Sequence, residues 1–287
     1  MSEYSALQMN FRHAFGHGLT FQAAYTWSHN IDDSTTTYFS TSVDDNYDLS
    51  RWRGTSDLNR TQVLVMNYVY DLPCFKNASH AFVKGARGGW QISGITSFFG
   101  GMPVESESAN PNFNCSNVVN PATSNTYNTG IGGNVRCYTV GPLKIQKGIN
   151  NDPTFGPTPS WYNPNVVTEP TLAQMAANGR PGMFGYLGRN VLTGPGRNNW
   201  DMALLKNFQL PWFHSEHSTL QFRLETFNTF KHPQWKTINA GCSGAPNNDG
   251  TAAWGRPCGG NTYNLGIGEV SGAWAPRIMQ FSLKFLF

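Results

Sequence analysis

The 287-residue sequence has little charge and no long apolar run. Only 13% of its residues are Asp, Glu, Lys or Arg, about half the usual fraction of a soluble domain. No apolar stretch reaches the roughly 18 residues that a transmembrane helix needs, which excludes a helical membrane protein. Aromatic residues make up 14% of the chain, which argues against general disorder. An all-β protein remains, either soluble or membrane-spanning.

Several functional signatures are also missing. The formal net charge of +3 comes from scattered basic residues without a basic stripe, so we expect no nucleic-acid partner. No G-x-S-x-G elbow, phosphate-binding loop or dinucleotide fingerprint occurs, so we expect no enzymatic activity and no cofactor. Residues 1–18 lack the regions of a signal peptide, which suggests a fragment of a longer product.

Alternation of apolar and polar residues is the strongest pattern in the sequence. At the C-terminus, Met279, Phe281 and Leu283 alternate with Gln280 and Ser282. A period of two residues is typical of a β-strand with one apolar face. Strands of about ten residues span a membrane when tilted, whereas soluble strands have five or six. Seven segments are predicted as strands: 7–12, 19–28, 60–71, 90–99, 200–209, 220–225 and 279–287.

The predicted connections alternate between short and long. Turns 16–18 and 210–217 are short and 72–89 is intermediate, whereas the other three connections are long and rich in Asn, Gly, Ser, Thr and Pro. Outer-membrane barrels have short periplasmic turns and long extracellular loops. With a periplasmic C-terminus, all three long loops lie outside the cell: 29–59, 100–197 and 230–275. The middle loop is too long to lack structure and is expected to hold additional β-ribbon.

Several segments, in order, resemble the barrels of Oar-like TonB-dependent transporters. They are Tyr70-Asp71-Leu72-Pro73, residues 184–190 (FGYLGRN), 194–197 (GPGR) with Trp200-Asp201, 220–228 (LQFRLETFN) with His232-Pro233, and 276–285 (PRIMQFSLKF). No single segment is a catalytic signature; their combination carries the resemblance.

The resemblance implies an antiparallel, up-and-down transmembrane β-barrel of about 22 strands, closed by a plug and energised by TonB. Residues 1–287 would form part of such a receptor-type barrel domain, about seven strands, without the plug domain and the earlier strands. The expected location is the outer membrane of a Gram-negative cell, in contact with its lipid. TonB would act only through the missing plug.

The C-terminal strand resembles the signal by which the barrel-assembly machinery recognises its clients. Phe281, Leu283, Phe285 and the final Phe287 fall on one side of the strand. An amphipathic strand pairs its backbone with an exposed edge while alternate side chains fill pockets. Seven strands alone would leave two open edges, each unpaired backbone group costing several kcal/mol in lipid. We therefore expect further strands to complete the barrel.

Charged residues within the strands are the candidates for solute contact. Arg12, Arg223 and Glu225 fall on the lumen face by parity, where they would either line a solute path or, as we favour, brace the interior. Lys206 falls on the apolar face, where a charge at the membrane midplane would cost about 2–4 kcal/mol. Lys206 is therefore expected either near the membrane–water interface or at a point where the pairing register of the strand shifts.

Cysteines and possible metal ligands lie mainly in the connections. Local spacing suggests disulfides Cys115–Cys137 and Cys242–Cys258, leaving Cys74 alone, and no C-x-x-C pair suggests zinc. We expect no metal site. Two clusters are weak candidates: His214 and His217 in a short turn, and the loop aspartates, for which a solvated loop is favoured over a calcium site. The aspartates are Asp32, Asp33, Asp44, Asp45, Asp48 and Asp57.

The leading hypothesis is a C-terminal fragment of an outer-membrane TonB-dependent transporter for a large solute, chelated iron or an oligosaccharide. Two alternatives stay open at this point: a soluble secreted β-sandwich that binds carbohydrate, and a surface adhesion or structural barrel.

Overall fold

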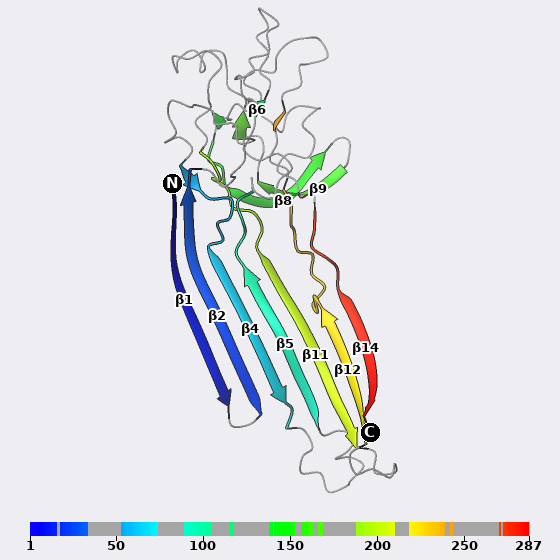
Figure 1. Ribbon diagram of the computed structural model, residues 1–287. Helices are drawn as coiled ribbons and strands as arrows, with labels where there is room; N and C mark the ends of the chain where they lie inside the picture. Colours follow the sequence, from blue (N-terminus) through cyan, green and yellow to red (C-terminus); the bar gives the residue numbers. More distant parts are fainter. Residues whose placement is uncertain are drawn as a thin grey trace, which may run out of the picture.

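A single large antiparallel sheet dominates the computed structural model (Figure 1). Its long strands neighbour one another in chain order: β1 (Ser2–Phe15), β2 (Leu19–Asp32), β4 (Gln62–Asp71), β5 (Trp90–Phe99), β11 (Arg197–Gln209), β12 (Thr219–Phe227) and β14 (Ile278–Leu286). The structure describes residues 1–15, 18–33, 53–73, 89–104, 115–116, 138–139, 141–152, 156–162, 166–168, 188–209, 218–238, 242–243, 270 and 272–286.

The up-and-down order confirms the predicted all-β antiparallel fold, and each predicted segment corresponds to one long strand. The strands β1, β2 and β11 are longer than expected, with 14, 14 and 13 residues. At about 3.4 Å per residue, β1 and β2 each extend over roughly 45 Å. The two-residue strand β3 (Gly54–Thr55) pairs with the end of β2. Within the described residues, no helix is long and apolar enough to cross a membrane.

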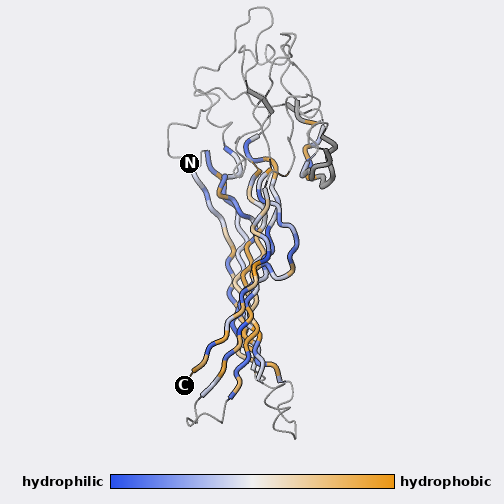
Figure 2. Tube along the Cα trace, turned by 90° about the vertical axis from the view of Figure 1, so that its right-hand side faces the viewer, coloured by the Kyte–Doolittle hydropathy of each residue, from blue (hydrophilic) through white to orange (hydrophobic). Residues whose placement is uncertain are grey.

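The sheet formed by the described residues is open. The strand β1 pairs with β2 and the strand β14 pairs with β12, and each lies at an edge of the sheet. Every residue of β1 and of β14 is exposed. The side view shows the strong twist of the sheet and the alternation of hydrophobic and hydrophilic residues along its strands (Figure 2).

Smaller β-elements lie above the sheet on the side of the long connections. A hairpin of β8 (Ile145–Asp152) and β9 (Gly156–Tyr162) confirms the additional ribbon expected in the middle loop. Two-residue bridges join β7 (Tyr138–Thr139) to β10 (Val167–Thr168), and β6 (Cys115–Ser116) to β13 (Cys242–Ser243).

The buried hydrophobic cluster lies in this upper part and not between layers of the sheet. Among the described residues it consists of Val104, Trp161, Tyr162, Leu192 and Ile238. A single-layer sheet has no interior, because a hydrophobic core forms only between packed layers of secondary structure. The conventional hydrophobic core is therefore restricted to the loop region.

The two ends of the middle connection are joined directly above the sheet. Pro103 forms a β-bridge with Thr193, the amide of Val104 donates to the carbonyl of Leu192 at 2.9 Å, and that of Gly194 to Met102 at 2.7 Å. A Cβ at Gly101 would overlap the carbonyl of Gly194, so only glycine allows this approach. We call this joined segment, residues 101–104 with 192–194, the loop clasp.

Candidate functional site

The continuous register of the sheet separates its side chains onto two faces. Residues paired across antiparallel strands point to the same side. One side, here called the apolar face, carries Leu7, Met9, Phe11, Phe21, Tyr25, Trp27, Leu64, Met66, Tyr68, Phe98, Trp200, Met202, Leu204, Phe222, Leu224, Phe281, Leu283 and Phe285.

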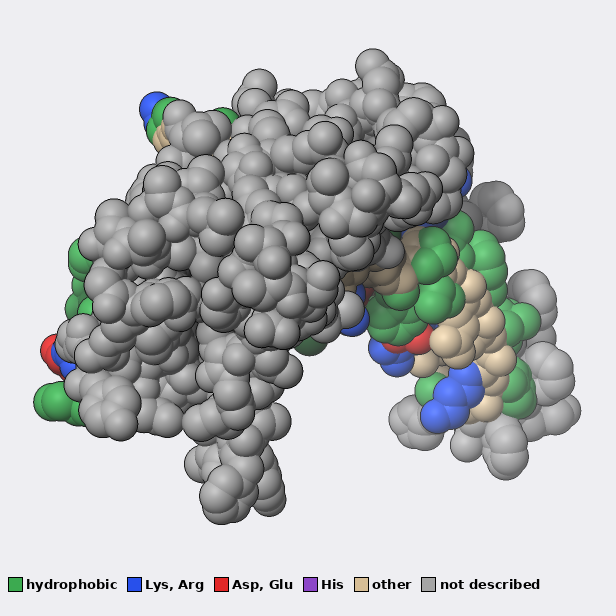
Figure 3. Space-filling model, turned by 90° about the horizontal axis from the view of Figure 1, so that it is seen from above, with side chains coloured by type: hydrophobic (Ala, Val, Ile, Leu, Met, Phe, Trp, Pro, Cys, Tyr) green, Lys and Arg blue, Asp and Glu red, His purple; other side chains and the backbone are tan. Residues whose placement is uncertain are grey.

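The opposite side, here called the polar face, carries most of the amide, hydroxyl and charged side chains of the strands. In the view from above, hydrophobic side chains (green) and acidic and basic ones (red and blue) are both visible on the uncovered part of the wall (Figure 3). Val65, Val69 and Ile95 interrupt the polar face in β4 and β5, where the alternation in the sequence was weaker. An apolar face towards lipid and a mixed, polar face towards the lumen is the pattern of a membrane-spanning β-wall.

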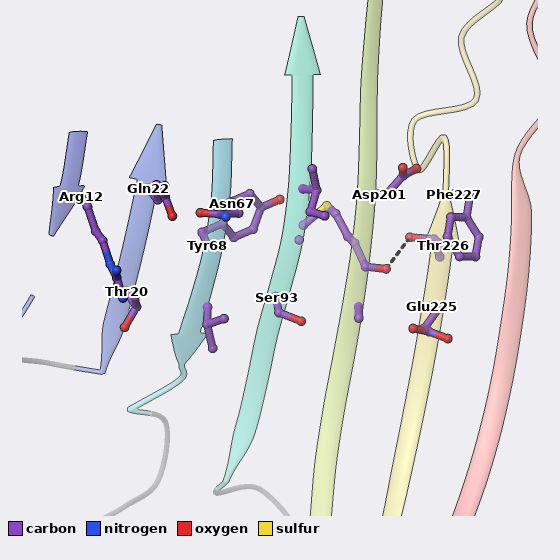
Figure 4. Close-up of a pocket in the computed structure, with 15 residues that line it drawn as sticks. Arg12, Thr20, Gln22, Asn67, Tyr68, Ser93, Asp201, Glu225, Thr226 and Phe227 are labelled. Atoms are coloured by element: carbon purple, nitrogen blue, oxygen red, sulfur yellow. Dashed lines mark hydrogen bonds between the residues drawn. The ribbon is translucent and has the colours of Figure 1, made fainter. Parts of the chain in front are cut away.

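The polar face contains a hollow of about 460 Å³, here called the lumen hollow. It extends over β1, β2, β4, β5, β11 and β12 (Figure 4). Its polar lining includes Arg12, Gln22, Asn67, Ser93, Asp201 and Glu225. Apolar atoms make up most of the lining surface, with Val69, Ile95 and Met202 among the lining residues, and the polar groups add hydroxyls, amides and both signs of charge to the same space.

Asp201, in the lumen hollow, supports the turn that follows β12. Its Oδ1 accepts a hydrogen bond from the backbone amide of Asn228 at 3.0 Å, and its Oδ2 accepts one from the side-chain amide of Asn199 at 2.7 Å. Asn228 has a positive φ of 52° and its side-chain amide donates to the carbonyl of Ala275 at 3.2 Å. Asp201 and Asn228 therefore connect β11, the turn after β12 and the segment before β14.

The three lumen-face candidates lie on the polar face, as their parity predicts. Arg223 and Glu225 form an ion pair along β12, next to each other on that face. Arg12 and Glu225 line the lumen hollow from its two sides, with Arg12 on β1 (Figure 4). The structure thus pairs Arg223 with Glu225, whereas four strands lie between β12 and Arg12 on β1. The role of these residues as solute contacts or braces stays a prediction.

Lys206 keeps its place on the apolar face without any shift of register, since it pairs with Trp90 on one side and Phe222 on the other. Its side chain is almost fully buried, 2% exposed. The ammonium group lies 5.0 Å from the ring centre of Phe208 and 5.9 Å from that of Trp90. Trp90 begins β5, so Lys206 lies near the ends of the strands. The free-energy cost of a charge on the lipid-facing side is lowest there.

A buried polar cluster at the other end of the strands was not foreseen from the sequence. Arg189 forms an ion pair with Asp32 at the end of β2 and donates to the carbonyl of Thr55 at 3.2 Å. Asn190 donates to the same carbonyl at 2.7 Å and to the Asp57 carboxylate. The Arg-Asn pair of the FGYLGRN segment therefore attaches the end of the middle loop to the β2–β3 region.

This cluster accounts for two of the loop aspartates, and Asp33 forms an ion pair with the N-terminal amine at 2.6 Å. Asp44, Asp45, Asp48, His214 and His217 lie outside the described residues. Within the described part of the chain, no group of three or more His, Cys, Asp or Glu side chains is placed to bind a metal ion.

The structure does not test the predicted disulfides. Cys74, Cys137 and Cys258 lie outside the described residues, so the pairs Cys115–Cys137 and Cys242–Cys258 stay predictions. The backbone places Cys115 directly opposite Cys242 in the parallel bridge between β6 and β13.

Three residues of the predicted C-terminal assembly signal are described by the structure, and their role as a signal stays a prediction. Phe281, Leu283 and Phe285 share the apolar face, and Phe281 and Leu283 are 65% and 66% exposed. Phe287 lies outside the described residues. The free edge of β14 leaves its backbone open to pairing, as strand addition requires.

Together, the up-and-down order, the apolar face and the polar lumen hollow define a wall of a membrane-spanning β-barrel. A family model described as an outer membrane beta barrel domain matches residues 1–280, and the chain belongs to this family. The protein is therefore an outer-membrane protein, which excludes the soluble secreted β-sandwich. No curated protein and no solved structure matches the chain.

Proposed function

We propose that the chain is the C-terminal part of a TonB-dependent transporter that takes up a large solute, either chelated iron or an oligosaccharide. The observation that carries this proposal is the open sheet, with an apolar face, a polar lumen hollow and two exposed edges. An exposed edge is costly in lipid, so the sheet needs further strands to close. A barrel much larger than seven strands suits a wide solute path.

The proposed partners follow from the same features. The apolar face contacts outer-membrane lipid, and β14 with its aromatic residues is the segment that the barrel-assembly machinery would engage. TonB would act through a plug outside these 287 residues. The polar face suggests binding and passage of a solute, and we expect neither enzymatic activity nor a nucleic-acid partner.

The proposal is tested by solute uptake in cells with and without TonB. Cells that express the protein should accumulate the solute only while TonB is present, whereas diffusion of a small solute through a general porin should be unchanged. Uptake that continues without TonB would contradict energy-coupled transport. If removal of the protein abolished cell attachment but left solute uptake unchanged, an adhesive or structural barrel would be favoured instead.

The size of the protein in the outer membrane gives a second test. An antibody against residues 230–275 should detect a band much larger than 31.8 kDa, because a plug and further strands add to the chain. A membrane band at 31.8 kDa would contradict the transporter and favour a small barrel formed by self-association.

A further inference from the structure

A second cavity, of about 550 Å³, lies at the loop end of the apolar face and is here called the rim pocket. Four of its lining residues form one row across adjacent strands, because Tyr25 pairs with Leu64, Leu64 with Phe98, and Phe98 with Asn198. Above this row, Trp161 of β9 and residues 232–235 complete the lining.

The row determines what can reach the rim pocket. Tyr25, Leu64 and Phe98 belong to the apolar face, the side of the sheet that meets lipid. They lie at the end of the strands from which the three long loops leave (Figure 1). The pocket is therefore located at the boundary between the outer lipid leaflet and the extracellular loops. Its location suits a membrane component and is separate from the lumen hollow.

The aromatic part of the rim pocket is rigid. Trp161 and Trp235 meet edge to face, with ring centres 5.9 Å apart and planes at 85°. The indole nitrogen of Trp161 donates to the carbonyl of Thr193 at 2.8 Å, which fixes the ring orientation. Trp161 is 5% exposed, whereas Trp235 is partly exposed. Flat aromatic surfaces of this kind contact the C–H groups of a sugar ring.

The polar part of the rim pocket contains an unsatisfied acceptor. Gln234 is 6% exposed, and its Nε2 donates to Asn228 at a long 3.4 Å. Its Oε1 is buried without a hydrogen-bond partner in the described structure, as is Nε of Arg197. Native proteins rarely leave such groups unpaired, and a ligand hydroxyl would satisfy the Gln234 oxygen.

The charge of the rim pocket selects among sugars. Its described lining includes Arg197 and His232 and no carboxylate. Arg197 pairs with Phe99 and so belongs to the polar face, whereas the His232 ring is hydrogen-bonded to Asn198 in the row. The guanidinium of Arg197 stacks at 4.3 Å from the ring centre of Trp274, and Lys236 lies 4.9 Å from the same ring. Basic groups held on aromatic rings suit an anionic substituent such as a phosphate.

We propose that the rim pocket binds the phosphorylated sugar headgroup of an anionic glycolipid from the outer leaflet. The aromatic pair would contact the ring, Gln234 would accept a hydroxyl, and His232 would face the anionic group. The lipid chains would lie along the apolar face below Phe98. This inference concerns the membrane-facing side and does not depend on the proposed transport function.

The test is native mass spectrometry of the protein extracted from outer membranes in a non-ionic detergent. Three probes are added in separate titrations: a rough-type lipopolysaccharide, its core oligosaccharide without acyl chains, and phosphatidylglycerol. We expect the lipopolysaccharide to bind at the lowest concentration. Trp235→Ala and Gln234→Met should each weaken it tenfold or more. Trp27→Ala, another aromatic on the apolar face but outside the rim pocket, should leave binding unchanged.

Each alternative result overturns a defined part of the proposal. Unchanged lipopolysaccharide binding in both Trp235→Ala and Gln234→Met would remove the pocket as its site. Equal affinity for the free oligosaccharide would show that the lipid part is not recognised, and equal affinity for phosphatidylglycerol would show that the sugar is not. The thermal transition of each variant is also recorded, to check that the variant folds. Gln234→Met preserves the side-chain volume and should keep the fold intact.

Discussion

Asp32 and Arg189 are 157 positions apart in the chain, yet they form an ion pair with side chains only 6% and 3% exposed. Burial lowers the pKa of Arg189 because the guanidinium loses its water, and the facing carboxylate offsets part of that cost. The pair connects the end of the middle loop to β2. It is therefore a long-range contact that holds the loop region on the sheet.

Arg189→Ala should destabilise this attachment strongly. Removal of one partner leaves the buried Asp32 carboxylate without the guanidinium that faces it, which costs about 3–5 kcal/mol. The measurement is thermal unfolding of the purified protein, together with the rate of proteolysis in the loops. Arg53→Ala is the matched control, because Arg53 and Glu3 form an exposed pair at 3.3 Å, worth about 0–1 kcal/mol. Equal effects of the two substitutions would contradict the structural role of Arg189.

Gly94→Ala should disturb the centre of the sheet. A Cβ at Gly94 would lie 2.7 Å from the Tyr68 hydroxyl and 2.8 Å from the Asp201 carbonyl, and the carbonyl belongs to the paired backbone of β11. Overpacking of this kind costs about 1–3 kcal/mol. The change is measured as the midpoint of urea unfolding in detergent. Gly141→Ala serves as the control, since its nearest neighbour would be an ordinary contact at 3.4 Å.

Asp201→Ala should loosen the turn after β12. The Asn228 amide would lose its acceptor, at a cost of about 1–3 kcal/mol for a group left unpaired. Hydrogen exchange at the Asn228 amide measures this directly. Asn207→Ala removes an exposed bond from Gln221 between the same two strands, 3.1 Å long, and should have little effect. Unaltered protection of Asn228 in Asp201→Ala would refute the capping role.

Phe285→Ser should reduce insertion into the outer membrane, because it removes an apolar-face side chain from the edge strand β14. The adjacent Lys284→Ser changes the polar face and should be tolerated. The readout is the amount of heat-modifiable protein in outer-membrane fractions. Equal loss in both variants would mean that assembly depends on the strand backbone alone.

Non-reducing peptide mapping should decide the disulfide pairing. The bridge between β6 and β13 places the backbones of Cys115 and Cys242 opposite each other, which predicts a link between two loops. The sequence spacing predicts Cys115–Cys137 and Cys242–Cys258 instead. A peptide joining residues around 115 and 242 would support the register, and the two local peptides would support the spacing.

Strand positions followed from the sequence because alternation is a local property. Each long strand carries its own period of two residues, so even the weaker alternation of β4 and β5 located them. Lys206 could be assigned to the apolar face, but not to its place beside Trp90 and Phe208, since that depends on the register with β5.

Contacts between the loops could not be predicted in the same way. Arg189 and Asn190 belong to a segment without periodicity, and nothing near them in the sequence indicates Asp32 or Thr55 as partners. The same holds for Trp161 and Trp235, which meet only because β9 and the segment after β12 fold over the same end of the sheet. Such pairs depend on how the loops fold over one end of the sheet, which the local sequence pattern does not encode.

The loop clasp has a consequence for how this protein can change over generations. Its two halves are bonded to each other at the very point where the chain leaves and re-enters the wall. The spacing of β5 and β11 is therefore set by the clasp and not by the length of the chain between positions 105 and 187. Trp161 and Tyr162 are the buried described residues of that connection that pack against the clasp, so changes in loop length are best tolerated where these two residues are kept.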